Sequence, residues 1–130
     1  MAGWEGINNA FTTRLNTNWI ETPIAWDNVS YDPVEGNEWI RATLIPSTTQ
    51  NAALGKAKKH FGIFWLQIFV PLNGGTGRAY ELAEMLDAIF SNMSFDEVVC
   101  YAADITRTGD DGNGWFQLDV RVNFWSFERI

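Results

Sequence analysis

Residues 115–127 read WFQLDVRVNFWSF, the most regular alternation of apolar and polar positions in the chain. From the second letter to the tenth, the even-numbered positions hold F, L, V, V and F, while the odd-numbered positions between them hold Q, D, R and N. Successive side chains of a strand point to opposite faces of a sheet, so this period of two predicts a strand with one apolar and one polar face. Trp115 and Trp125 stand at the two ends of the polar row.

The same period outlines the rest of a sheet. Residues 61–70 (FGIFWLQIFV) alternate, with Leu66 on the apolar face and Trp65 on the other. Three more strands are expected, at 24–26, 39–45 and 98–106.

Apolar residues recur at helical spacing in two segments, 4–16 and 79–90. The predicted order is therefore α-β-β-β-α-β-β, and strands that follow one another directly favour a largely antiparallel sheet of four to five strands. Both helices should cover the face that carries Leu44, Leu66 and Leu118, which gives an α+β two-layer sandwich. A chain of 130 residues without a repeat or a linker should form one domain, 1–130.

The connections have the composition of loops. Residues 27–37 contain Asp-Pro and Glu-Gly-Asn, and residues 47–60 are small, polar and lysine-bearing with no apolar period. Residues 107–114 (RTGDDGNG) predict a turn in which Asn113 and Gly114 supply positive φ angles.

The charge balance argues against non-specific nucleic-acid binding. The chain has 9 Lys and Arg against 16 Asp and Glu, a net charge of −7, whereas neutralisation of phosphates supplies most of that kind of affinity. Residues 39–60 are a local exception, because they contain no acid and four basic residues: Arg41, Lys56, Lys58 and Lys59. This stretch is either a solvated loop or a docking segment.

No catalytic or metal-binding constellation is found. Cys100 is the only cysteine, so neither an internal disulfide nor a cysteine zinc site can form, and it lies in an apolar run where a buried thiol is expected. His60 is the only histidine. The N-terminus lacks the pattern of a signal peptide and residues 63–72 are too short to span a membrane, so an intracellular protein is expected.

Two glycine-bearing segments resemble ligand loops only at first sight. In NGGTGRAY (73–80) the positions that a P-loop gives to lysine and serine or threonine hold Arg78 and Ala79, so we interpret the segment as a strand-to-helix turn with Thr76 as the helix N-cap. Counted from Asp111, an EF-hand would need glycine where Phe116 stands and glutamate where Val122 stands. No cofactor and no metal are expected.

The aromatic content is the most informative property of the composition. The chain has seven Trp, nine Phe and three Tyr. Trp65, Trp115 and Trp125 fall on the sheet face predicted to point away from the helices. Aromatic residues and arginine are enriched in interface cores, so another chain is expected to cover this face. The alternative is that residues 47–60 fold over it.

Five pieces, in this order and spacing, carry a resemblance to a known family: WEGINNAFTTRLNTNW, TPIAWDNVSYDP, EWIRATLIPS, GIFWLQIFVPLNGGTG and TRTGDDGNGWFQLDVRVNFW. Together they resemble the tail terminators, a minor tail protein family of long non-contractile-tailed bacteriophages. The resemblance covers nearly the whole chain.

The resemblance implies a structural virion protein that forms a hexameric ring. Such a ring caps the tail tube, stops its polymerisation and presents a surface to the head connector proteins, while genomic DNA passes through without specific binding. It implies assembly in the host cytoplasm and residence in the tail or neck of the virion. No enzyme activity, cofactor or membrane is implied.

The resemblance points to two groups of candidate functional residues. The assembly interface is expected to include Arg41, Lys56, Lys58, Lys59, Trp65, Trp115, Arg121 and Trp125. An acidic lumen, which would repel DNA phosphates, is expected to draw on Glu81, Glu84, Asp87, Asp110 and Asp111.

Other classes remain open from the residues alone. Another neck or head–tail joining protein of the same fold fits the same pattern. A small ligand-binding domain or enzyme would need polar groups that converge on the helix-facing side of the sheet, and the sequence places almost none there. A nucleic-acid-binding module would have to rely on the one basic stretch.

Overall fold

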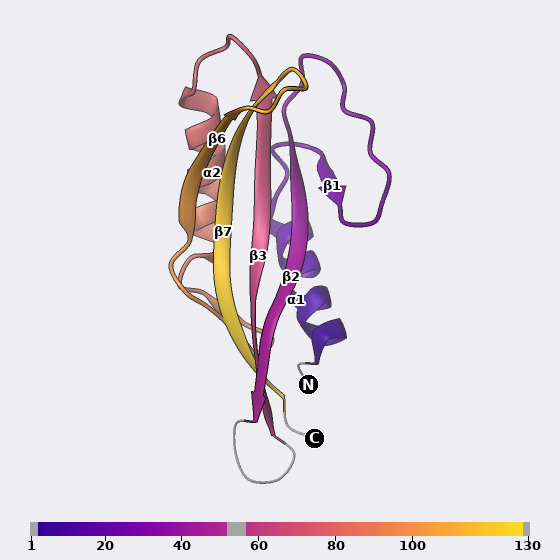
Figure 1. Ribbon diagram of the computed structural model, residues 1–130, viewed down its shortest axis with the longest axis vertical. Helices are drawn as coiled ribbons and strands as arrows, with labels where there is room; N and C mark the ends of the chain where they lie inside the picture. The colour runs from indigo at the N-terminus through magenta and orange to yellow at the C-terminus, as the bar shows by residue number, and fades with distance from the viewer. Residues whose placement is uncertain (1–2, 52–56, 129–130) are drawn as a thin grey trace.

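The computed structural model, drawn in Figure 1, describes residues 3–51 and 57–128. Its elements are α1 (Trp4–Asn18), β1 (Ile24–Trp26), β2 (Trp39–Asn51), β3 (Lys58–Pro71), α2 (Gly77–Phe90), β4 (Ser94–Phe95), β5 (Val98–Cys100), β6 (Asp104–Asp110) and β7 (Trp115–Glu128). The predicted class, α+β with two helices and a largely antiparallel sheet, is confirmed, but the sheet has seven strands rather than four to five.

Strand β7 is the centre of the sheet. One of its edges pairs antiparallel with β3 from Lys58↔Glu128 to Pro71↔Trp115. Its other edge pairs with β6 and, nearer its C-terminal end, with β5. Beyond β3 lie β2, antiparallel, and the short parallel edge strand β1. The stretch with the clearest alternation therefore meets three other strands.

The predicted strand at 98–106 is wrong in detail, because two strands, β5 and β6, take its place. Cys100 pairs with Phe124, and Asp104 pairs with Arg121. Between these two pairs the chain uses four residues where β7 uses three. The register therefore shifts by one residue, and the pairing with β7 is interrupted at 101–103. Strand β6 then continues to Asp110 and takes up half of the expected turn at 107–114. The two-residue strand β4 was not predicted.

The expected loop at 47–60 is also wrong where the structure describes it. Residues 47–51 prolong β2 and 58–60 prolong β3, with a bulge between Pro46 and Thr48, so the two strands form one long hairpin. Residues 45–51 are exposed, and a strand with no buried face leaves no apolar period to recognise. Residues 52–56, and Lys56 among them, lie outside the described part of the chain.

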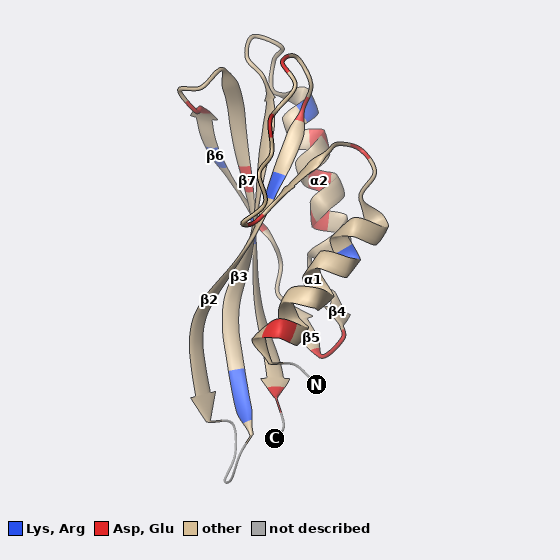
Figure 2. Ribbon diagram, turned by 90° about the vertical axis from the view of Figure 1, so that its right-hand side faces the viewer, with Lys and Arg blue, Asp and Glu red and all other residues tan. Residues whose placement is uncertain are grey.

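Both helices cover one face of the sheet, as predicted, and the main core lies between the two layers (Figure 2). Phe11 of α1 is at its centre: its ring stacks on Phe64 at 4.4 Å between centroids and also contacts Phe90, Phe95 and Phe124. The two helices are further joined by Arg14, whose Nε donates to the carbonyl oxygen of Ile89 at 2.8 Å. Leu66 and Leu118 are fully buried on this face, and Leu44 packs against the cluster.

The close approach at Gly62 gives a test of the sheet packing. A Cβ at this position would lie 2.8 Å from both the Ile45 carbonyl oxygen and the Phe124 ring, whereas a Cβ at Gly77 would meet nothing within 4 Å. We therefore expect Gly62→Ala to lower the free energy of unfolding by about 1–3 kcal/mol. The control Gly77→Ala should leave it unchanged or raise it by up to about 1 kcal/mol. Urea denaturation measures both, and a Gly62→Ala protein as stable as the wild type would contradict the packing described here.

Candidate assembly surface

The two helices leave the opposite face of the sheet uncovered. Register and alternation place its residues in rows across β2, β3 and β7, such as Thr43–Trp65–Arg121 and Ile45–Ile63–Asn123. We call this surface the open sheet face. Its residues are Arg41, Thr43, Ile45, Lys59, Phe61, Ile63, Trp65, Arg121, Asn123 and Trp125, all of them exposed or half-buried.

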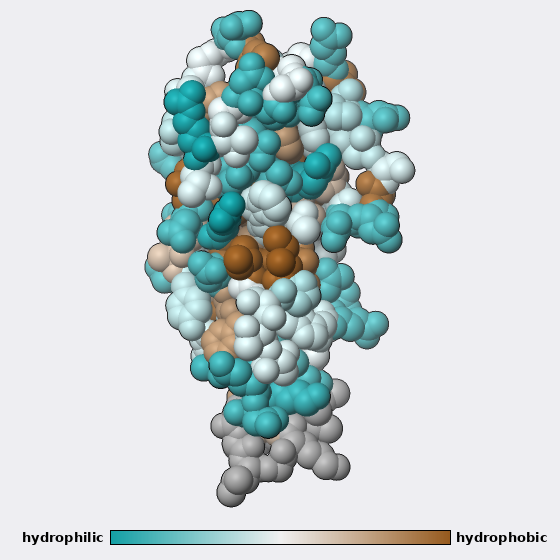
Figure 3. Space-filling view, viewed as in Figure 1, coloured by the Kyte–Doolittle hydropathy of each residue, from teal (hydrophilic) through white to brown (hydrophobic). Residues whose placement is uncertain are grey.

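Apolar side chains gather in the middle of this face. Figure 3, seen from the sheet side, shows the apolar patch surrounded by polar residues. The described residues of the 47–60 segment extend the hairpin away from this patch instead of folding over it (Figure 1). Sequence reasoning missed Ile45, Phe61 and Ile63, although their odd positions on the alternating strands were a sufficient signal.

Each cation on the open sheet face lies over an aromatic ring. Arg121 is 5.6 Å from the Trp65 ring centroid, and the Lys59 ammonium is 4.2 Å from that of Trp125. Arg41 is 5.3 Å from the Trp39 ring. Such contacts hold a long cationic side chain along the sheet and are worth about 0.5–1 kcal/mol each at exposed sites.

The acid of β7 in these rows, Asp119, is buried and hydrogen-bonded. Asp119 is 4% exposed, and its two carboxylate oxygens accept hydrogen bonds from Gln117 Nε2 at 2.8 Å and Thr108 Oγ1 at 3.0 Å. Within the residues that the structure describes, Arg41, Lys59 and Arg121 form no ion pair. The open sheet face therefore carries three cations without an ion-pair partner in the described ranges, and the exposed acid Asp104 of β6 lies beside Arg121 in the same row.

One end of the same sheet face is covered from within the chain, by a segment that sequence reasoning did not consider. The connection between β1 and β2 brings Tyr31 against Trp39, which stacks on Phe69 at 4.1 Å and meets Trp115 edge-on at 6.0 Å. Trp39, Phe69 and Ala25 are buried there as a second small cluster. Only the part of the face beyond this cluster is free to meet another chain.

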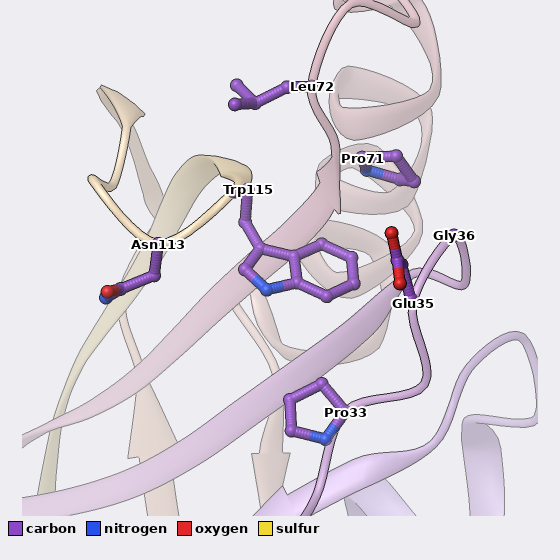
Figure 4. A pocket seen from close by; sticks show the side chains of 8 residues that line it. Pro33, Glu35, Gly36, Pro71, Leu72, Asn113 and Trp115 are labelled. Atoms are coloured by element: carbon purple, nitrogen blue, oxygen red, sulfur yellow. The ribbon is translucent and has the colours of Figure 1, made fainter.

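Trp115 lies in an open pocket at the edge of this covered end. The pocket has a volume of about 540 Å³, and Figure 4 shows the Trp115 ring in its middle, with Pro33 on one side and Pro71 on the other. Glu35 also lines it. Trp115 is thus half-buried at the end of the predicted interface rather than within the open sheet face. Lys58, at an even position of β3, falls on the other side of the hairpin.

The five predicted lumen acids fall into two separate groups. Glu81, Glu84 and Asp87 lie on α2, whereas Asp110 and Asp111 lie where β6 turns into β7, on the opposite side of the sheet (Figure 2).

Among the helix acids, Glu81 is bound to Arg78, which also donates from Nε to Glu38 at 2.8 Å. The hydrogen bonds to Glu38 and Glu81 raise the pKa of Arg78. Because Glu38 immediately precedes β2, this ion pair ties the start of α2 to the sheet.

The acids of the β6–β7 turn accept hydrogen bonds from backbone amides of the turn. Asp110 Oδ1 accepts from the Gly112 amide, and Asp111 Oδ1 accepts from the amides of Asn113 and Trp115. The positive φ angles belong to Gly112 (84°) and Gly114 (95°), so the expectation for Asn113 was wrong. These bonds account for the Asp-rich sequence as turn chemistry.

The glycine segment after β3 is a turn leading into α2. Thr76 occupies the N-cap position as predicted, but its side chain makes no capping hydrogen bond. Asn73 and Gly75 adopt positive φ angles of 68° and 82°, which let the chain reverse. Throughout the described ranges, no group of three or more His, Cys, Asp and Glu is placed to hold a metal ion.

His60 and Cys100 are both buried and occupy separate structural positions. The ring of His60 bridges Thr49 Oγ1 at 2.8 Å and Glu128 Oε1 at 2.7 Å, which links three neighbouring strands at the hairpin end of the sheet. Cys100 lies in the main core. Neither described helix is both long and apolar enough to cross a membrane.

The comparisons with known proteins agree with this architecture. A sequence model of the family described as phage tail terminator protein matches residues 6–124. The chain belongs to the phage tail terminator family. It is therefore a structural protein of a bacteriophage tail, as the resemblance in the sequence indicated.

Solved structures support the fold of this tail terminator. Fourteen solved chains match it significantly. One of them, which carries only a sequence identifier as its name, is 22% identical, covers 100% of this chain and 99% of its own, and has a TM-score of 0.69. No curated protein matches significantly.

The burial of Cys100 leads to a chemical prediction. Burial raises the pKa of its thiol to about 12, an effect that the nearby Arg14 guanidinium only partly offsets, so the thiol stays protonated at neutral pH. We expect native protein to react with Ellman's reagent at least about 100-fold more slowly than urea-unfolded protein, because the thiolate is the reactive form. Thr13→Cys, which places a thiol on the exposed side of α1, supplies the fast-reacting control. Equal rates for Cys100 and that control would refute the buried environment.

Proposed function

We propose that this tail terminator closes into a hexameric ring on the end of the tail tube, stops its polymerisation and offers the surface on which the head connector docks. The observation that carries the proposal is the family match over residues 6–124. The open sheet face supports it, because an aromatic and cationic surface of this kind is suited to burial against another chain. A closed ring buries such surfaces between its subunits, so the assembly does not go on adding subunits.

We further propose that the hairpin end of the sheet meets the tube. Lys58 and Lys59 lie there, on the two sides of the β2–β3 hairpin, and neither has an ion-pair partner among the described residues. The hairpin projects beyond the helix layer (Figure 2), so it can reach a neighbouring particle without rearrangement of the core.

Assembly with the purified tail-tube protein tests both proposals. Native mass spectrometry should show hexamers, and electron microscopy should show tubes that end in a ring and become shorter as more terminator is added. Lys58→Glu, on the side of the hairpin away from the open sheet face, should still form rings but cap tubes at least about tenfold less efficiently, since opposed charges become like charges. Arg107→Glu, which reverses an exposed cation of β6 at the other end of the sheet, is the matched control.

Each contrary result has a distinct meaning. Rings that leave tube length unchanged would contradict termination and indicate a joining protein of the neck. Normal capping by the lysine variant would remove the hairpin from the tube contact.

For the DNA passage, we propose that Asp110 and Asp111 line the lumen. Both side chains lie in the turn between β6 and β7, whereas Glu81 is already paired with Arg78. Acidic walls repel phosphates and so let DNA slide.

Asp110→Lys should therefore slow DNA release from assembled particles, because a cationic wall binds phosphate. Asp110 is the residue to change, since Asp111 holds two backbone amides of the turn. Asp110→Asn, which keeps the turn geometry, should lie close to the wild type. Release kinetics followed by a DNA-binding dye give the comparison, and identical rates for the lysine variant and the wild type would exclude Asp110 from the lining.

A further inference from the structure

The helix layer carries acids whose charge is opposite to that of Arg41, Lys59 and Arg121 on the open sheet face. The outward side of α2 presents Tyr80, which is 43% exposed, and the acids Glu84 and Asp87. Neither acid has an ion-pair partner among the described residues. The last turn of α2 contains no basic residue. Because Arg14 of α1 already binds the Ile89 carbonyl oxygen at this helix end, the negative charge of the surface comes from the two acids.

The cations of the open sheet face have a spacing that suits these acids. Arg41 is opposite Gln67 and Arg121 is opposite Trp65, so the two arginines lie on either side of β3 in adjacent rows, about 7 Å apart along the strands and about 10 Å apart across them, or about 12 Å in all. Glu84 and Asp87 are three residues apart and therefore neighbours on the helix surface, with Cβ atoms about 5–6 Å apart. The long arginine side chains can span the remaining difference.

The dimensions of the two surfaces also agree. With 14 residues, α2 is about 21 Å long. The stretch of β3 from Lys59 to Gln67, which runs the length of the open sheet face, covers about 26 Å. Next to the Arg121 row, on its hairpin side, lie Ile45 and Ile63, which can receive the apolar side of Tyr80.

We propose that α2 of each subunit lies on the open sheet face of the next subunit, with Glu84 and Asp87 paired to Arg121 and Arg41. This inference rests on the ring of the proposed function. The two surfaces are on opposite sides of one subunit (Figure 2), so every subunit gives its helix to one neighbour and its sheet to the other. A head-to-tail contact closes into a ring when the rotation that relates neighbouring subunits divides a full turn into a whole number of steps.

A charge exchange between two variants tests the contact. The helix variant is Glu84→Lys/Asp87→Lys, and the face variant is Arg41→Glu/Arg121→Glu. Each alone sets like charges against each other, so at least about tenfold more protein should be needed for ring formation. Mixed in equal amounts, the two should form rings again, because each helix then meets a face of opposite charge. Native mass spectrometry should find equal numbers of both variants in every restored ring.

Glu5→Lys/Asp27→Lys is the matched control, since it changes the net charge as much as the helix variant does at exposed positions away from both surfaces. Its rings should form at the wild-type concentration. Circular dichroism and thermal melting verify that every variant is folded.

The possible failures are distinguishable. If folded variants assemble as the wild type does, or if the mixture stays monomeric while each variant alone is disrupted, the helix-on-sheet contact is refuted and the ring itself stands. A wild-type protein that stays monomeric at every concentration, with and without tube protein, refutes the ring and this contact together.

Discussion

The pairing of β3 with β7 is the constraint on which the rest of this structure depends. The two strands share a ladder from Lys58↔Glu128 to Pro71↔Trp115 without a change of register. Because side chains alternate along both strands, this register decides at once which residues enter the core and which remain outside. A slip of one residue would bring Arg121 and Asn123 into the helix layer and expose Leu118 and Val120. The ring cluster around Phe11, which Phe64 and Phe124 supply from the two strands, holds the register in place.

The two faces that this ladder creates have different chemistry. On the helix side, large apolar side chains are excluded from water, and this burial supplies most of the stability. On the other side, arginine and lysine lie over tryptophan and phenylalanine rings, and the acid Asp119 is withdrawn into hydrogen bonds. The result is a partly apolar surface that bears arginine and lysine on an acidic protein. The cations of this surface and the acids of α2 lie on opposite sides of the subunit (Figure 2), which is the polarity of the head-to-tail contact proposed above.

Sequence patterns anticipated those elements whose side chains divide cleanly between water and core. Both helices, the long strands and the aromatic face opposite the helices follow from periodicity, as does the burial of Cys100. The patterns failed where backbone pairing alone decides the structure. Residues 47–51 form strand because β3 supplies hydrogen-bonding partners, although both of their faces are exposed. The break at 101–103 arises because the chain there has one residue more than the stretch of β7 it faces, and no local sequence pattern indicates this.

The sequence by itself determined the class of the fold, the inner face of the sheet, the turn chemistry and the family, because each depends on side chains whose identity and spacing are local. Only the tertiary structure decided how much of the outer face stays open. The loop between β1 and β2 buries Trp39 and Phe69, whereas residues 47–51 extend away from the face. These are relations between segments far apart in the chain, and they arise from packing, which has no periodicity in the sequence.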